Sequence, residues 1–255
     1  MASEPRKPGE FCWINILSPQ PEAAKAFFSS LLGWEYGDIP GMGWFIQAGG
    51  SPVGGLFDLE GPNTPPGTPA GIGVMVLVED ADAIAQRAKD LGGDSRPAFD
   101  VGPQGRMAEI IAPDGAKIDV WQAKGMASTS ADRALPGVPN WIETMTPDAE
   151  RAARFYTDLF GWTVEKVPNS AVDYSIFKLD GVPAAGLMPR PADLEKVPPH
   201  WAVYMTVADA DATVKKALEL GGTVFVQPRD IPNYGRFAGV MSPQGVHFYI
   251  IKHAM

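Results

Sequence analysis

The sequence predicts an α+β protein built from two tandem modules, each of two βαβββ units whose curved mixed sheets carry helices on the outer face. Three observations support this fold class. Most of the chain repeats once, each copy contains two helix patterns, and short β-rich runs separated by Gly and Pro surround those helices. Helices set beside groups of short strands are typical of an α+β architecture.

The repeat is visible in segments that return in the same order. The segment PEAAKAFFSSLLGW (21–34) recurs as DAERAARFYTDLFGW (148–162), and VLVEDADAI (76–84) recurs as MTVADADAT (205–213). The tetrapeptide GRMA returns as GRFA, and a Pro-x-Gly turn follows it both times. The offset changes only from 128 to 130 residues, which indicates two homologous modules. We place them at 9–124 and 137–253, with a linker at 125–136.

The first helix of each module has an apolar stripe at helical spacing. Pro21 suits the first turn of one and Gly33 its C-terminal end, while Thr146 and Pro147 are predicted as cap and first position of the other. The stripes consist of Ala24, Phe27, Phe28, Leu31 and Leu32, and of Ala152, Phe155, Tyr156, Leu159 and Phe160. A second helix in each module is expected between the Asp-Ala-Asp-Ala stretch and the Gly-Gly pair.

Each module ends in a hairpin around a Pro-x-Gly turn. IIAPDGAKIDVWQAK (110–124) closes the first module and VMSPQGVHFYIIKHA (240–254) the second. The turn residues match, but Asp119 stands where the second copy has Tyr249. Ahead of each hairpin, Asp100 and Arg106 recur as Asp230 and Arg236. We interpret these pairs as salt bridges that hold the loop; an arginine fork for an anionic ligand is the alternative.

Composition restricts the class of partner. The 255 residues are 45% hydrophobic and 20% charged, with a mean hydropathy of −0.07, as in soluble globular proteins. No apolar run approaches the roughly 20 residues of a membrane span, and the N-terminus lacks the apolar core of a signal peptide. A single cysteine, Cys12, favours a cytoplasmic protein, and the net charge of −9 argues against a nucleic-acid partner. We expect a monomer or homodimer without a membrane partner.

These residues resemble the vicinal oxygen chelate superfamily, which includes glyoxalase I, extradiol dioxygenases and bleomycin-resistance proteins. SPQPEAAKAFFSSLLGW, VEDADAIAQRAKDLGG and GRMAEIIAPDGAKIDVWQ carry the resemblance, which covers nearly the whole chain twice. The chain is similar to tandem two-module glyoxalase-like proteins of actinobacterial type. The resemblance implies the fold, whereas the activity must come from the site, because this scaffold hosts unrelated chemistries.

In metal-dependent members of that superfamily, His, Glu or Gln side chains hold a divalent ion inside the curved sheet. The matching positions in this chain are Trp13, Gly73 and Asp119, and Trp141, Ala202 and Tyr249. Catalytic zinc usually keeps three protein donors, and these positions supply one carboxylate between them. We therefore predict that the metal site of the family is lost and that no cofactor is needed.

The inner face of each sheet is the predicted site, because side chains two apart on a strand share a face. The candidate ligand-binding residues are Trp13, Asn15, Asp119, Trp121, Trp141, Glu143, His200, His247 and Tyr249. Aromatic rings mixed with a few polar groups suit a small organic molecule, and carboxylates favour a cationic one. The leading hypothesis is metal-independent binding of such a molecule in aromatic-lined cavities, for sequestration or resistance. The competing interpretation is that the tryptophans fill the sheets as core.

Two enzymatic alternatives stay open. His200, His247 and Glu143 each lie two residues from a family ligand position and could form a relocated site for Zn, Ni, Fe or Mn. That site would make the protein a metal-dependent lyase, isomerase or dioxygenase. The other alternative is a metal-free enzyme with Glu143 or Asp119 as its general base.

Overall fold

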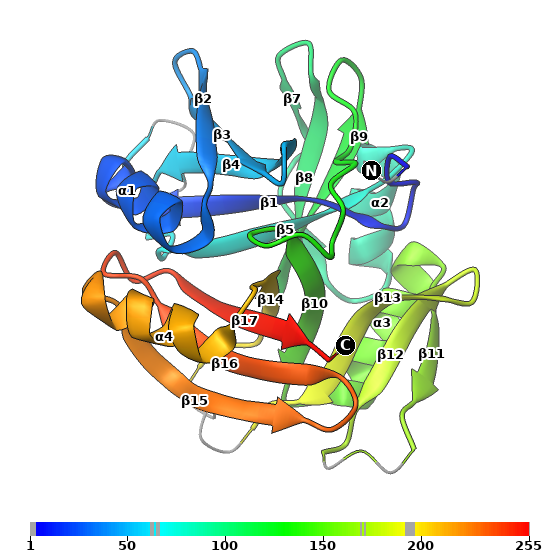
Figure 1. Ribbon diagram of the computed structural model, residues 1–255. Helices are drawn as coiled ribbons and strands as arrows, with labels where there is room; N and C mark the ends of the chain where they lie inside the picture. The colour runs from blue at the N-terminus through cyan, green and yellow to red at the C-terminus, as the bar shows by residue number, and fades with distance from the viewer. Residues whose placement is uncertain are drawn as a thin grey trace.

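The computed structural model describes residues 4–61, 64, 67–168, 170, 172–191 and 197–254, which form two mixed sheets and four helices (Figure 1). The helices are α1 (Pro21–Leu32), α2 (Ala81–Asp90), α3 (Ala149–Phe160) and α4 (Ala210–Glu219). The strands of the first sheet are β1 (Phe11–Ser18), β2 (Glu35–Ile39), β3 (Gly43–Ala48), β4 (Ser51–Asp58), β5 (Gly71–Leu77), β6 (Asp94–Ser95), β7 (Phe99–Val101), β8 (Gly105–Ile111) and β9 (Lys117–Ala123). Those of the second are β10 (Pro139–Thr146), β11 (Thr163–Lys166), β12 (Ser175–Leu179), β13 (Val182–Pro189), β14 (His200–Thr206), β15 (Thr223–Ile231), β16 (Gly235–Met241) and β17 (His247–His253).

Strand pairing joins the two halves of one module into one sheet. The orders are β2-β3-β4-β1-β5-β9-β8-β6, with β7 beside β8, and β11-β12-β13-β10-β14-β17-β16-β15. The first strands of the two halves pair antiparallel, β1 with β5 and β10 with β14. Both sheets also contain parallel pairs, such as β1 with β4. The predicted α+β fold with two tandem mixed sheets is therefore confirmed.

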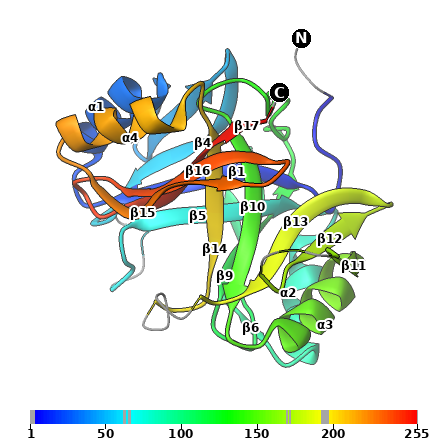
Figure 2. The same ribbon diagram turned by 60° about the horizontal axis from the view of Figure 1, so that its bottom comes forward.

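The helices cover one face of each sheet and leave the other face to separate side-chain clusters. One large hydrophobic cluster contains the buried helix residues and continues from one module into the other. α1 contacts α4 and α2 contacts α3, so each helix lies beside a helix of the other module (Figures 1 and 2). The opposite face, here called the inner face, has its own side-chain cluster in each module. The side chains of each inner face thus pack separately from the shared core.

Two tryptophans, one in each module, each donate a hydrogen bond across the boundary between the modules. The Trp34 indole Nε1 donates to the Gly137 carbonyl at 2.7 Å, and Trp162 Nε1 donates to Gly9 at 2.9 Å. Both rings are 3% exposed or less. The acceptors are 128 residues apart, as are the tryptophans, so the same contact is made twice in opposite directions. The repeat therefore encodes an interface with approximate twofold symmetry.

The Asp-Ala-Asp-Ala stretches have two structural roles. The first Asp caps the helix: Asp80 accepts from the Ala83 N–H and Asp209 from the Ala212 N–H. The second Asp binds the arginine of the Gly-Arg motif through two bonds of 2.6 and 2.9 Å, as the pairs Asp82–Arg106 and Asp211–Arg236.

The Asp–Arg salt bridges predicted to hold the loops are also present, at longer distances than the contacts of Asp82 and Asp211. Arg106 lies 3.5 Å from Asp100 and Arg236 lies 3.1 Å from Asp230. The predicted Thr146 cap is wrong, because Asp148 caps α3 by accepting from the Arg151 N–H. The Thr146 hydroxyl instead donates to Asp114 Oδ2 of the first module at 2.5 Å.

Candidate functional site

The inner face of the second module is built from aromatic rings. Tyr204 on β14 and Tyr249 on β17 are paired in register, and their rings stack 4.6 Å apart at 19°. Phe237 packs beside both rings, and Phe225 meets Tyr249 edge-on at 5.3 Å. We call this group the aromatic face: Trp141, Tyr204, Phe225, Phe237 and Tyr249. Tyr204 and Tyr249 are buried, whereas Phe225 is 36% exposed at the edge.

A buried carboxylate lies among these rings. Glu143 is 4% exposed, and it accepts from the Tyr204 hydroxyl through Oε1 and from the Tyr174 hydroxyl through Oε2, both at 2.7 Å. Trp141 Nε1 donates in turn to the Tyr174 oxygen at 2.8 Å. Gly186 pairs with Glu143, and a Cβ there would overlap the Tyr174 hydroxyl. The glycine therefore gives Tyr174 access to the carboxylate.

Glu143 has no cationic partner among the described residues, since no ion pair of this part of the chain includes it. Burial raises the pKa of Glu143, and the hydrogen bonds from Tyr174 and Tyr204 oppose that shift. Burial and the nearby Glu143 charge together raise the pKa of both tyrosines. The phenols therefore stay protonated at neutral pH and remain donors to the carboxylate.

The two histidines of this module lie near the face without joining Glu143. His200 Nδ1 is 2.9 Å from the Pro198 carbonyl, and the His247 ring meets Phe225 edge-on at 5.4 Å. Burial lowers the pKa of both imidazoles, so they are neutral at physiological pH. No three His, Cys, Asp or Glu side chains of the described ranges converge as a metal-binding group. The donor set thus does not fit the metal of the fold family, and the relocated site proposed from sequence is not assembled.

The inner face of the first module is packed differently. Trp13 and Trp121 are 5% and 2% exposed and form a cluster with Cys12, Met75 and Leu77. Trp121 Nε1 donates to the Met126 carbonyl at 3.2 Å. These tryptophans fill the sheet as core, which was the alternative interpretation of the sequence.

Asp119 and Asn15 are the polar groups of this first inner face. They flank Gly73 across β1, β5 and β9, and Asn15 Nδ2 donates to the Met75 sulfur at 3.2 Å. Asp119 is partly exposed and has no hydrogen bond or ion pair with another described residue. Burial, followed by the neighbouring Glu109 charge, raises the pKa of Asp119 to about 7. The acid in this copy of the hairpin is therefore a titratable group without a hydrogen-bond or ion-pair partner in the part of the chain that the structure describes.

The structure brings Trp141, Glu143 and Tyr249 into one site, as the strand alternation indicated, and places His200 and His247 at its margin. Sequence reasoning missed Tyr174, Tyr204, Phe225 and Phe237. Tyr204 lies two residues beyond Ala202 on β14, so the same period-two rule could have found it. Tyr174 lies just before β12 in an irregular segment, where no periodic signal exists.

Two curled α+β modules in tandem, each with one mixed sheet, define a tandem glyoxalase-like fold. The model of the Glyoxalase/Bleomycin resistance protein/Dioxygenase superfamily matches residues 139–249, which include the aromatic face. The chain is 36% identical over 250 residues to CFP32 of Mycobacterium tuberculosis (strain CDC 1551 / Oshkosh), a glyoxylase by its provisional name, covering 95% of this chain and 94% of that one. The protein therefore belongs to this superfamily.

Two further comparisons concern a second full-length relative and a solved structure. The anthracycline biosynthesis protein DauV of Streptomyces sp. (strain C5) is 32% identical over 260 residues, covering 96% of this chain and 94% of DauV. The Mn(II)-bound glyoxalase of Novosphingobium aromaticivorans superimposes with a TM-score of 0.66 at 16% identity, over 96% of this chain and 82% of that one. This structural likeness concerns the fold alone. No helix in the described ranges is long and apolar enough to cross a membrane.

Proposed function

We propose that the protein binds a planar organic molecule on the aromatic face of the second module, with Glu143 as polar anchor and without a metal. The observation that carries this proposal is a buried carboxylate that two phenols hold and that has no cationic partner among the described residues. Each carboxylate oxygen accepts one tyrosine bond and retains lone-pair capacity for a second donor. Stacked rings beside that acceptor suit a flat ligand with a donor group.

The ligand is expected to carry a positive charge or strong hydrogen-bond donors. An ionised carboxylate inside a protein is costly unless a cation or donors compensate for it. The tyrosines compensate in part, and a ligand cation would complete the compensation. Phe225, exposed at the edge of the face and lying over Gly239, is the ring that a ligand meets first.

The names of two relatives support a fused-ring ligand. DauV and the Streptomyces peucetius protein DnrV, also 32% identical over 260 residues, are named for anthracycline biosynthesis. Anthracyclines are flat polycyclic molecules, and some carry an amino sugar. Binding of such a compound by this chain would serve sequestration or resistance.

Isothermal titration with an amino-sugar anthracycline, daunorubicin, and with its uncharged aglycone tests the proposal. We expect the wild type to bind the amine more tightly, and Glu143→Gln to weaken amine binding about tenfold while affecting the aglycone less. Tyr249→Ala should weaken both probes, because it removes a stacking ring. Asp119→Asn alters the inner face of the other module and is the matched control. Equal affinity of wild type and Glu143→Gln for the amine would refute the proposal that Glu143 anchors the ligand.

A second candidate function is metal-free proton transfer by Glu143. The observation that favours it is the raised pKa of this buried carboxyl, since catalytic acids and bases are tuned in this way. Mass spectrometry of the same probes after incubation would detect a product. Product formed by wild type and lost in Glu143→Gln would support catalysis; unchanged probes would leave binding as the function.

A further inference from the structure

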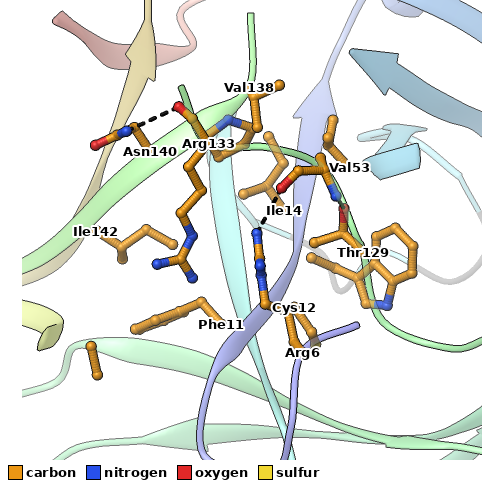
Figure 3. A pocket seen from close by; sticks show the side chains of 14 residues that line it. Arg6, Phe11, Cys12, Ile14, Val53, Thr129, Arg133, Val138, Asn140 and Ile142 are labelled. Atoms are coloured by element: carbon orange, nitrogen blue, oxygen red, sulfur yellow. Dashed lines mark hydrogen bonds between the residues drawn. The ribbon is translucent and has the colours of Figure 1, made fainter. Parts of the chain in front are cut away.

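A cavity lies where the two modules, the N-terminal segment and the linker meet. Its volume is about 30 Å³, and Arg6, Trp13, Thr129, Arg133 and Asn140 are among its lining residues (Figure 3). Arg6 precedes β1, Arg133 belongs to the segment between the sheets, and Asn140 lies on β10. This cavity is separate from the aromatic face, which shares none of these residues.

Two arginines lie side by side in this cavity (Figure 3). Arg6 is held by a bond of 2.9 Å from Nη2 to the Ala131 carbonyl. The Arg133 backbone carbonyl accepts from Asn140 Nδ2 at 3.0 Å and from the Thr206 hydroxyl at 2.7 Å, which fixes the position of the residue. Burial lowers the pKa of Arg133, and the positive charge of Arg6 adds to that shift. Two like charges are therefore confined to one small, partly buried space.

The Arg133 guanidinium lacks a compensating anion among the described residues. No described side chain or carbonyl accepts a hydrogen bond from it, and no carboxylate there lies within ion-pair distance. Burial lowers the pKa of both arginines and the negative charge of Glu10 opposes that shift, but Glu10 forms no ion pair with either of them. Its Oε2 instead accepts from the Lys7 backbone N–H at 2.8 Å. A partly buried guanidinium without an acceptor is costly, which points to a missing anion.

Trp13 of β1 is also among the lining residues, and its ring packs in the inner-face cluster of the first module. Its ring is 5% exposed, and its indole N–H has no hydrogen-bond partner within the part of the chain that the structure describes. A guanidinium can only donate, so each of the two arginine side chains needs acceptors. The charged side chains of the lining, Arg6 and Arg133, therefore come from the N-terminal segment and the linker.

We propose that this junction cavity binds a small oxyanion, either a carboxylate group or an inorganic oxyanion. A volume of about 30 Å³ corresponds to one or two water molecules, so it fits a carboxylate group rather than a whole organic ligand. Guanidinium groups match such anions through charge-assisted bonds. Because its two arginine ligands come from the N-terminal segment and the linker, the bound anion would also stabilise the junction.

Isothermal titration of the full chain with formate and, separately, with inorganic phosphate tests this site at constant ionic strength. We expect saturable binding of at least one anion. Saturation by formate would identify a carboxylate site, and saturation by phosphate would identify a site for an inorganic oxyanion. Arg133→Gln should weaken that binding at least tenfold. Arg6→Gln, which removes the neighbouring guanidinium, should weaken it severalfold. Arg151→Gln, at an exposed arginine of α3, is the matched control and should bind as wild type does.

Thermal unfolding provides a second measurement, because a ligand that binds only the folded state raises Tm. The saturating anion should raise the Tm of wild type and of Arg151→Gln, and it should raise that of Arg133→Gln much less. Arg6→Gln retains Arg133, so it keeps the test decisive if Arg133→Gln folds poorly. Absence of saturation for both anions, or equal affinity of all variants, would overturn the proposal.

Discussion

Trp162→Ala is expected to lower the free energy of unfolding by about 3–5 kcal/mol, the usual loss for a large buried aromatic side chain. The ring is 3% exposed and packs against Phe11 of the other module, and also against Phe177 and Trp201. Its N–H crosses the module boundary to the Gly9 carbonyl. The substitution therefore opens a cavity and leaves a buried acceptor unsatisfied. Urea denaturation followed by circular dichroism measures the change.

Three further variants distinguish interface from local packing. Trp162→Phe keeps most of the ring and removes the hydrogen bond, so a loss of about 1 kcal/mol is expected. Trp34→Ala should resemble Trp162→Ala, because Trp34 makes the reciprocal contact. Trp44→Ala, at a half-buried ring 4.1 Å from Lys25 Nζ, should cost less. If Trp34→Ala were as mild as Trp44→Ala, the symmetric interface would not contribute as inferred.

Asp119→Asn is expected to stabilise the protein above pH 7 and to have little effect below pH 4. The folded state raises the pKa of Asp119 to about 7, whereas the unfolded chain releases that proton near pH 3.8. Between these values the folded state binds more protons, so wild-type stability falls as the pH rises. The full shift would correspond to about 4 kcal/mol at 1.36 kcal/mol per pKa unit. Because Asp119 is partly exposed, solvent screening reduces the expected gain at pH 8 to about 1–2 kcal/mol.

Urea unfolding of wild type and Asp119→Asn at pH 4, 6 and 8 measures this dependence. Asp38→Asn, at an exposed carboxylate of β2, is the matched control and should follow wild type at every pH. Glu109→Gln should reproduce part of the Asp119→Asn gain, since the Glu109 charge contributes to the shift. A constant difference between wild type and Asp119→Asn across this range would contradict the raised pKa.

Features that depend on neighbouring residues could be predicted from the sequence. The repeat implied two similar sheets, and the apolar stripes located α1 and α3, because helix periodicity is a local property. The alternation of β10 and β17 placed Trp141, Glu143 and Tyr249 on one face for the same reason. The repeated sequence motifs also resemble those of the superfamily, and the full-length similarity to CFP32 confirms that the chain belongs to it.

Features that depend on contacts between distant segments could not be predicted from the sequence. Thr146 has the chemistry of a helix cap, but its hydroxyl donates to Asp114 of the other module, and Asp148 caps the helix. His200 and His247 lay within two residues of ligand positions, yet strand direction and side-chain packing leave them apart from Glu143.

The sequence by itself determined the two modules, the helices and the residues that alternate toward each inner face, because these follow from spacing along the chain. Only the tertiary structure decided how those faces differ. Trp13 and Trp121 are core in one module, whereas Glu143 in the other receives Tyr174 from an irregular segment 31 residues away. Burial and hydrogen bonding depend on which segments meet in space, and those contacts set the protonation of Glu143 and Asp119.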